Sequence, residues 1–399
     1  MDVVPMGAKD IARLDRIGLV GRGSDSPLRE LVLDALSQGR RKGFGSALRR
    51  LEGAERAALG RLARRNRVET IVAHSLMDAG YQDGELAASH DRMRATLDSW
   101  MDELDSIAAS CGRDGIAVVA LKNGGIARGV YPCRGCCPMG DLDLLVPRDR
   151  FRDAHRIMLS MGYALASRSI VEPASLEQGE ASGGCEYVKE VGEGRLWVEI
   201  QWRAIAGRWI RKDQEPDGGR LIGRSVAIPG TSVRLLRPVD NLIQVSLHTA
   251  KHSYVRAPGL RLHTDVDRLV AYAPPDWKEF VSEVERLRVR HSVFFSLAMA
   301  QALLESPIPE WVLDRLAPPD WKVRIFEKWV AARSVFEPDM PKFARPEMML
   351  FHAMLYDDIG GLAASVMDTD LDSVGPKYAL RNAIRGWGRI RDIITRYQA

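Results

Sequence analysis

The sequence predicts an α+β fold in which a core with a small mixed β-sheet is flanked by N-terminal and C-terminal helical regions. Helical periodicity dominates the first hundred residues, short apolar runs between turn residues follow, and helical periodicity returns from Pro238 onward. The 399-residue length suits two or three folding units. We therefore expect a helical region at 1–110, an α/β core at 111–205 and a second helical region at 206–399.

Each element of the expected core has a local signature. An apolar stripe at i, i+4, i+7 and i+8 predicts an amphipathic helix over Asp91–Ala108. Apolar runs bounded by turn residues predict buried strands at Ile116–Leu121 and Asp141–Val146. Cys185–Val191 and Arg195–Trp202 are strand-like and separated by Gly-Glu-Gly, which predicts a hairpin.

Composition limits the class of protein. Hydrophobic residues make up 46% of the chain and charged residues 28%, which is the balance of a globular protein and excludes a collagen-like or wholly disordered chain. The five cysteines are few and odd in number, which favours a reducing compartment. The N-terminus lacks a signal-peptide pattern, and no uncharged apolar run is long enough to span a bilayer. We expect a cytoplasmic protein with no membrane partner.

Basic residues are concentrated in one part of the chain although the net charge is only +4. The helix-like stretch Arg40–Arg67 holds ten bases and two acids. A smaller stripe, Arg381, Arg385 and Arg389, would share one helix face near the C-terminus. Both are interpreted first as solvated helix faces, and second as surfaces for an anionic ligand.

Acidic residues at two places indicate metal chemistry. Asp141 and Asp143 are two apart on an expected strand, so both carboxylates lie on one face, where Mg²⁺ or Mn²⁺ would offset their repulsion. Glu199 interrupts a largely apolar strand and would complete a three-carboxylate cage; the alternative is an edge-strand acid that faces water. Upstream, a strand runs into Gly124 and Gly125 before a helix, a junction that attracts phosphate.

These motifs resemble those of the DNA polymerase β-type nucleotidyltransferase superfamily, and within it a family of uncharacterised bacterial nucleotidyltransferases. The resemblance extends from about residue 61 to residue 270, and its most specific part is the Pro-Met-Gly-Asp-Leu-Asp-Leu-Leu-Val block. The segments that carry it are Leu121–Gly124, Cys137–Val146, Val198–Arg203, Leu247–His252 and Leu260–Asp265.

The resemblance implies an enzyme that transfers a nucleoside monophosphate from an NTP such as ATP to an acceptor hydroxyl, with release of pyrophosphate. Asp141, Asp143 and Glu199 are then the catalytic residues and metal ligands, and the ions stabilise the attacking and leaving oxygens. Backbone amides of Gly124 and Gly125 are expected to hold the β- and γ-phosphates.

Further nucleotide contacts are expected from cationic and imidazole groups. His248, Lys251 and His252 fall at i, i+3 and i+4, on one helix face. Together with Lys122 they are assigned to nucleotide binding. Histidines at a helix–core boundary and a capping lysine are the alternative interpretation.

Three departures from the family pattern question the catalytic rate. Asn123 stands where the family has glycine, and Cys137 stands where it has arginine, with Arg134 as a nearby substitute. Glu199 and Gln201 replace aspartate and histidine. One alternative is therefore a catalytically impaired nucleotide-binding protein.

The acceptor is inferred from the charge balance. Modest net charge and the absence of a recognisable RNA-binding module favour a small molecule or a peptide or protein hydroxyl. A tRNA or other RNA is the second possibility, with Arg40–Arg67 as the phosphate-contacting surface. A metal-dependent glycosyltransferase, which also uses D-x-D, ranks last because the preceding hundred residues are helical.

The cysteines Cys133, Cys136 and Cys137 raise the question of a structural zinc site. Such a site needs four ligands. A second C-x-x-C does not occur, and the one H-x-x-x-H pair, His248 and His252, is assigned to nucleotide binding. We therefore expect reduced thiols that line a tight loop.

Overall fold

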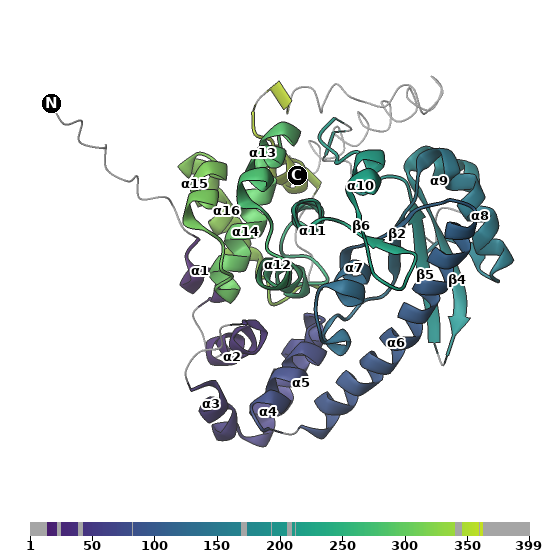
Figure 1. Cartoon of the computed structure of the whole chain (residues 1–399). Helices are drawn as coiled ribbons and strands as arrows, with labels where there is room; N and C mark the ends of the chain where they lie inside the picture. The colour runs from purple at the N-terminus through teal and green to yellow at the C-terminus, as the bar shows by residue number, and fades with distance from the viewer. Residues whose placement is uncertain are drawn as a thin grey trace, which may run out of the picture.

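The α+β architecture is confirmed: a seven-stranded mixed sheet is surrounded by helices (Figure 1). The structure is a computed structural model, and it describes residues 14–21, 25–38, 43–81, 83–168, 174–192, 194–205, 210–211, 213–339, 345–358 and 360–361. Within these residues, no helix is both long and apolar enough to cross a membrane. The buried hydrophobic side chains form one connected core that joins the helical regions to the sheet.

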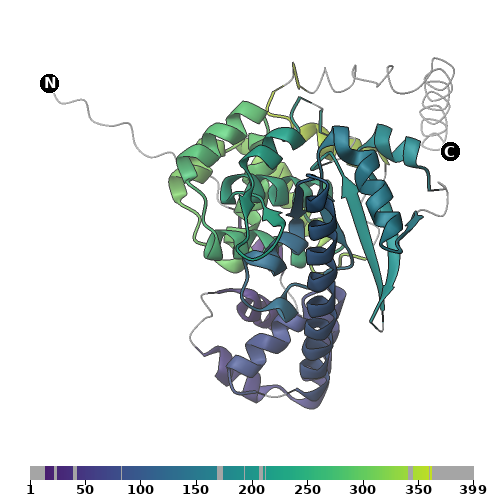
Figure 2. The ribbon, with the colours of Figure 1, turned by 45° about the vertical axis from the view of Figure 1, so that its right-hand side comes forward.

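The N-terminal region is helical, and its last helix reaches the sheet. Figure 2 shows that helix, α6, running past both the N-terminal helices and the strands. Its first turn is capped by Asp83, whose side chain accepts a hydrogen bond from the Leu86 amide at 3.0 Å. The helices of this region are α1 (Arg16–Val20), α2 (Ser26–Leu36), α3 (Phe44–Arg50), α4 (Gly53–Arg65), α5 (Glu69–Asp78) and α6 (Gly84–Arg113).

The sheet has the strand order β3-β4-β5-β2-β1-β7-β6. β2 runs parallel to β5 and antiparallel to β1, and β4–β5 is the predicted hairpin. β6 and β7 follow residue 205 in the chain but belong to the same sheet. A core boundary at residue 205 would therefore separate these two strands from the other five. The strands are β1 (Val118–Leu121), β2 (Leu142–Leu145), β3 (Ala164–Ala166), β4 (Gly184–Val191), β5 (Gly194–Gln201), β6 (Val226–Ala227) and β7 (Val233–Leu235).

Helices next to the strands cover one face of the sheet. α7 (Lys122–Gly129) follows β1 directly and packs against β1 and β2, and α8 (Phe151–Ser160) packs against β5. A side chain on Gly125 would place its Cβ 2.8 Å from the Ala120 carbonyl oxygen, so glycine permits the close approach of α7 to β1. The 3-10 turn η2 (Arg148–Arg150) precedes α8, and the helix α9 (Leu176–Ser182) packs against β4. A second 3-10 turn, η1 (Arg134–Cys136), packs against α5 and α6.

The C-terminal region is a helical bundle in which α11, α12 and α14 contact one another. Its interior contains the stacked rings of Phe295 and Phe326, whose centroids are 3.9 Å apart. The helices are α10 (Gly218–Arg224), α11 (Pro238–Lys251), α12 (Arg261–Tyr272), α13 (Trp277–Leu287), α14 (Arg290–Leu304), α15 (Glu310–Leu316), α16 (Asp320–Arg333) and α17 (Arg345–Met354).

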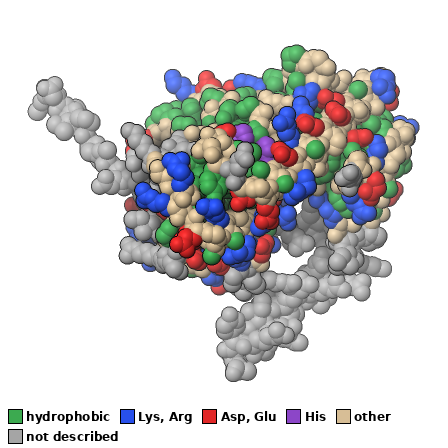
Figure 3. Space-filling model, turned by 90° about the horizontal axis from the view of Figure 1, so that it is seen from below, with side chains coloured by type: hydrophobic (Ala, Val, Ile, Leu, Met, Phe, Trp, Pro, Cys, Tyr) green, Lys and Arg blue, Asp and Glu red, His purple; other side chains and the backbone are tan. Residues whose placement is uncertain are grey.

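The basic stretch expected to be helical forms α3 and α4 where it is described. Arg64 pairs with Glu85 at 2.8 Å, and Arg65 approaches Asp339 at 3.8 Å, so acids from other segments offset part of the charge. Figure 3 views the molecule from the side where α3 and α4 lie, and basic and acidic side chains alternate there. The residues at 40–42 and the stripe at 381, 385 and 389 lie outside the described residues.

Candidate active site

Strand register places three acidic residues in a row on one face of the sheet. Asp143 on β2 is paired with Glu199 on β5, and Glu199 is paired with Glu186 on β4. Side chains of directly paired residues lie on the same face, so the three carboxylates share the face opposite α7 and α8. We call Asp143, Glu199 and Glu186 the carboxylate row. Asp141 lies directly before β2, beside this row.

Two basic side chains offset the charge of these acids. Lys122, the first residue of α7, brings its Nζ to 2.5 Å from Oδ1 of Asp143. Arg168, in the segment after β3, places Nη1 2.7 Å from Oδ2 of Asp141 and Nε 2.6 Å from Oε1 of Glu186. The structure thus brings Asp143 and Glu199 together, whereas Asp141 is bound at the margin through Arg168.

Burial and charge together shift the pKa values of the central groups. Burial, reinforced by the neighbouring Asp143 carboxylate, raises the pKa of Glu199 to about 7. Burial alone would also raise the pKa of Asp143, but the Lys122 ammonium and hydrogen bonds to Lys122 and Glu199 hold it below its usual value. The same carboxylates keep the pKa of Lys122 above its usual value in spite of burial. Asp143 and Lys122 are therefore an ion pair at neutral pH.

A pocket of about 420 Å³ opens beside Asp141 and Asp143. A volume of this size is within the range of small-molecule sites. Its walls come from the N-terminal helices, the α7 and β2 segments and the C-terminal bundle. The lining residues are Arg67, Glu69, Met93, Lys122, Asn123, Pro138, Met139, Gly140, Asp141, Asp143, His248, His252, Ala257, Pro258 and Arg261.

The N-terminus of α7 faces this pocket through Lys122 and Asn123. No side chain caps the helix, so its first amide groups and the positive end of its dipole are free of side-chain partners. Gly124 and Gly125 lie in this first turn and are buried against β1 and β2. Packing thus explains why these positions are glycine. Lys122 and Asn123 line the pocket, whereas Gly124 and Gly125 are not among its lining residues.

Of the three residues expected on one face of α11, two line the pocket and one does not. His248 and His252 line the pocket with ring centroids 4.7 Å apart, and Lys251 is exposed. Burial, with the nearby Lys122 charge, holds the pKa of His248 well below its usual value, and burial lowers the pKa of His252 to about 4. Both rings are therefore neutral at pH 7. Lys251 lies close enough to influence Asp143 and Glu199 electrostatically.

Comparison with known protein families identifies the chain. The model of a family described as "uncharacterised nucleotidyltransferase" matches residues 52–305. The chain belongs to this nucleotidyltransferase family. No curated protein and no solved structure matches it significantly. The matched range begins before α4 and ends after α14, so it includes α4–α6, the whole sheet and α10–α14, and it leaves out α1–α3 and α15–α17.

Where this nucleotidyltransferase departs from the expected pattern, the structure supplies local reasons. The Asn123 side chain donates a hydrogen bond to the buried Asp265 carboxylate at 3.0 Å, which connects α7 to α12. Arg134 is not a substitute for an arginine at Cys137, because its guanidinium pairs with Asp98 on α6 and does not line the pocket.

Sequence reasoning missed several charged residues of the candidate site. Arg67 was interpreted only as part of a basic surface, and Arg261 only as part of a motif, yet both line the pocket. Arg261 is fixed by a 2.6 Å hydrogen bond from Nη1 to the Pro138 carbonyl oxygen. Glu186 could have been predicted from the hairpin, because its direct pairing with Glu199 puts both acids on the same face of the sheet. Arg168 had no such signal, because it belongs to an irregular segment.

Proposed function

We propose that this protein transfers a nucleoside monophosphate from an NTP to an acceptor hydroxyl with release of pyrophosphate, in a reaction that depends on a divalent cation. Membership of the nucleotidyltransferase family supports the general reaction. The observation that carries the specific proposal is the pairing of Asp143 with Glu199 on adjacent strands, beside a pocket that also contains Asp141 and Lys122.

The carboxylates suit a hard divalent cation. Asp141, Asp143 and Glu199 offer oxygen donors of the kind that Mg²⁺ and Mn²⁺ prefer. Lys122 pairs with Asp143 and Arg168 pairs with Asp141, so positive charge already stabilises these carboxylates in their ionised form. The bound ions would supply Lewis-acid stabilisation of charge on the attacking and leaving oxygens.

The opposite side of the pocket suits the triphosphate. Lys122, Arg67 and Arg261 contribute positive charge, and the uncapped N-terminus of α7, where Asn123 lines the pocket, contributes backbone donors. The neutral rings of His248 and His252 complete the wall as hydrogen-bonding groups rather than as charges. The triphosphate would thus be oriented with its α-phosphorus near Asp141 and Asp143.

The group transfer itself is a single displacement. The acceptor oxygen forms a bond to the α-phosphorus, and the bond from that phosphorus to the bridging oxygen of the β-phosphate breaks. Pyrophosphate leaves with the bonding electron pair, and the hydroxyl proton is released to solvent. The contribution of the chain is to hold the reacting groups in line and to neutralise the charge that develops.

A small molecule or a peptide or protein hydroxyl is the acceptor that we favour over RNA. The pocket volume fits a nucleotide with a compact acceptor group. The basic helices α3 and α4 are partly paired with acids, as described for Arg64 and Arg65, so the face on which an RNA backbone would dock has mixed charge.

The experiment that tests this proposal incubates the protein with Mg²⁺ or Mn²⁺ and each labelled NTP. Pyrophosphate release and labelling of the protein itself are measured, with and without added small molecules, peptides or total tRNA. We expect cation-dependent pyrophosphate release with at least one NTP, and only a weak dependence on salt. Cation-dependent NTP binding without any pyrophosphate release would instead support the impaired nucleotide-binding alternative. Activity that requires tRNA and falls steeply with salt would support the RNA acceptor.

A further inference from the structure

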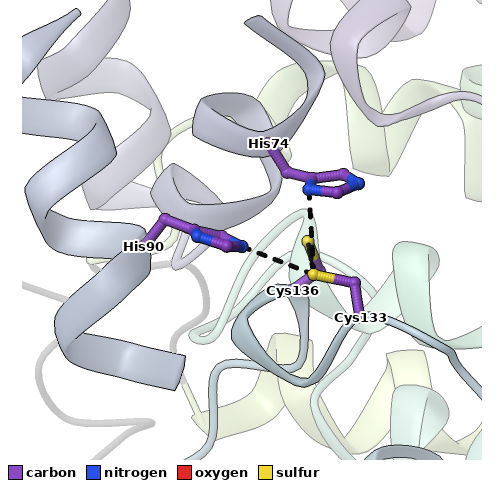
Figure 4. A group of neighbouring side chains, drawn as sticks. All are labelled: His74, His90, Cys133 and Cys136. Carbon is purple, nitrogen blue, oxygen red and sulfur yellow. Dashed lines mark hydrogen bonds between the residues drawn. The ribbon is translucent and has the colours of Figure 1, made fainter. Parts of the chain in front are cut away.

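Four potential metal ligands meet outside the carboxylate row. His74 on α5, His90 on α6, and Cys133 and Cys136 around η1 place one donor atom each so that all four lie within 4.8 Å of one another (Figure 4). The two further ligands that no sequence motif supplied are therefore present in the fold, beside thiols that are free as expected. The two histidines belong to different helices and are sixteen residues apart, so no motif in the sequence revealed them.

The two histidine–Cys133 distances are close to those of a tetrahedral site. His90 Nε2 lies 3.4 Å and His74 Nδ1 lies 3.8 Å from the Sγ atom of Cys133. With Zn–S bonds of about 2.3 Å and Zn–N bonds of about 2.0 Å, tetrahedral geometry requires N–S edges of roughly 3.5 Å. The two Sγ atoms are 2.8 Å apart, so they would separate by about 1 Å to reach a tetrahedral S–S edge.

The surroundings of the histidines fit metal ligation. The second ring nitrogen of each faces a carboxylate: His74 Nε2 is 3.5 Å from Asp78, and His90 Nδ1 is 3.5 Å from Asp91. Carboxylates at this position fix the tautomer and orientation of metal-binding histidines. Gly135 leaves room for His90, because a Cβ there would come within 2.7 Å of its Nε2.

We propose that His74, His90, Cys133 and Cys136 bind one Zn²⁺ ion. Two thiolates and two imidazoles form a ligand set that zinc prefers, and they fill all four tetrahedral positions. With no coordination position left for water or substrate, the ion is structural rather than catalytic. Cys136 is fully buried and the side chain of His90 is 7% exposed, so the ion is largely shielded from solvent.

The position of the site defines its role. It connects α5 and α6 to the segment that continues through Pro138 and Gly140 to Asp141. The same segment is held from the other side by Arg261, through the Pro138 carbonyl oxygen. Zinc would thus anchor the N-terminal helices to the loop that presents Asp141 at the pocket. This inference is independent of the proposed function, because neither catalysis nor NTP binding enters it.

A Cys133–Cys136 disulfide is the competing interpretation of the two close thiols. Both cysteines are free in the structure, and their 2.8 Å Sγ separation exceeds the roughly 2.05 Å of a disulfide bond. A disulfide would also leave the convergence of His74 and His90 on Cys133 without a cause.

The first experiment measures metal in the full-length protein, purified with a tag that contains no histidine. Elemental analysis is expected to find about one zinc per chain, and mass spectrometry without reductant is expected to find no Cys133–Cys136 disulfide. After zinc is removed by a chelator and replaced by Co²⁺, the protein should show the visible absorption of tetrahedral cobalt with thiolate ligands. Alkylation of Cys133 and Cys136 should be slow before chelation and fast after it.

The second experiment uses variants. Cys136→Ser and His90→Ala are expected to lose most of the zinc, whereas Cys111→Ser is expected to retain it. Cys111 is the matched control because it is a buried free cysteine on α6, the helix that also carries His90. Asp143→Asn should also retain zinc, which separates this site from the carboxylate row. If Cys136→Ser does not fold, the cobalt spectrum and the alkylation rates of the unaltered protein decide the question.

The opposite results would overturn the proposal. Purified protein without zinc that also fails to bind added Zn²⁺ or Co²⁺ at this site contradicts it. So does a Cys133–Cys136 disulfide in protein prepared under reducing conditions, or zinc that persists in both ligand variants.

Discussion

The carboxylate row and the His/Cys cluster both gather side chains from distant parts of the chain, but by different structural means. In the row, β2, β4 and β5 are hydrogen-bonded neighbours, so register alone fixes Asp143 opposite Glu199 and Glu199 opposite Glu186. In the cluster, α5, α6 and η1 share no ladder and meet through packing. A pattern based on strand alternation can therefore reveal the first site in a sequence, whereas local spacing reveals only the two cysteines of the second site and not its two histidines.

The two sites also differ in how their charge is balanced. The carboxylates are hard oxygen donors, and Lys122 and Arg168 already lie against them. The cluster offers imidazole nitrogen and sulfur, which select softer ions. Our two proposals therefore assign different ions to the two sides of one loop, an exchangeable catalytic cation at the carboxylates and a structural ion at the His/Cys cluster.

The largest effect is expected from Asp143→Asn, which tests whether the row is catalytic. The substitution removes the carboxylate that contacts both Lys122 and Glu199, and loss of several kcal/mol of transition-state stabilisation lowers pyrophosphate release by about a thousandfold or more. The Lys122 ammonium loses its Asp143 partner, but Glu199 and Asp141 still offset its charge, so the fold should survive. Activity assays and thermal melts measure the two quantities. The control is Asp102→Asn, an exposed acid on α6; near-normal activity of Asp143→Asn would remove the row from the mechanism.

A smaller effect should distinguish positions within the row. Glu199→Gln is expected to lower kcat by about ten- to a hundredfold, because Glu199 contacts Asp143 directly. Glu186→Gln is expected to cost less than about threefold, since Glu186 lies at the end of the row and is bound to Arg168. Steady-state kinetics of both variants test the order. Equal losses would mean that all the acids act as one site.

The smallest effect concerns a buried acid that belongs to neither site. Asp267 accepts a 2.6 Å hydrogen bond from the Ser306 hydroxyl, and burial raises its pKa to about 6. The folded protein therefore binds a proton more tightly than the unfolded chain, so this group makes the free energy of unfolding fall as pH rises from about 4 to about 6.

Asp267→Asn should remove that part of the pH dependence. We compare the free energy of unfolding of the variant with that of the unaltered protein at each pH. The value for the variant minus that for the unaltered protein should be about 2 kcal/mol higher at pH 7.5 than at pH 4. Urea titrations at the two pH values measure the difference, and pyrophosphate release at constant pH serves as the control. A difference that is the same at both pH values would contradict the assignment.

Much of the core followed from periodicity. The amphipathic stripe before residue 108 became α6, the two apolar runs became β1 and β2, and the hairpin formed as β4 and β5. Glu199 was identified because an acid in an apolar strand needs a partner, and register supplied Asp143. Arg168, Arg261 and Arg67 were beyond such reasoning as site residues, because side chains from irregular segments and separate helices acquire neighbours only when the whole chain packs.

The sequence by itself determined the element types, the mixed sheet and the D-x-D motif, because local periodicity and turn chemistry act over a few residues. Only the tertiary structure decided that Asn123 bonds to Asp265, that Arg134 turns to Asp98, and that His74 and His90 meet the thiols. These contacts join residues that are far apart along the chain, and their geometry depends on how helices pack. Packing is a property of the complete core, which no short stretch of sequence encodes.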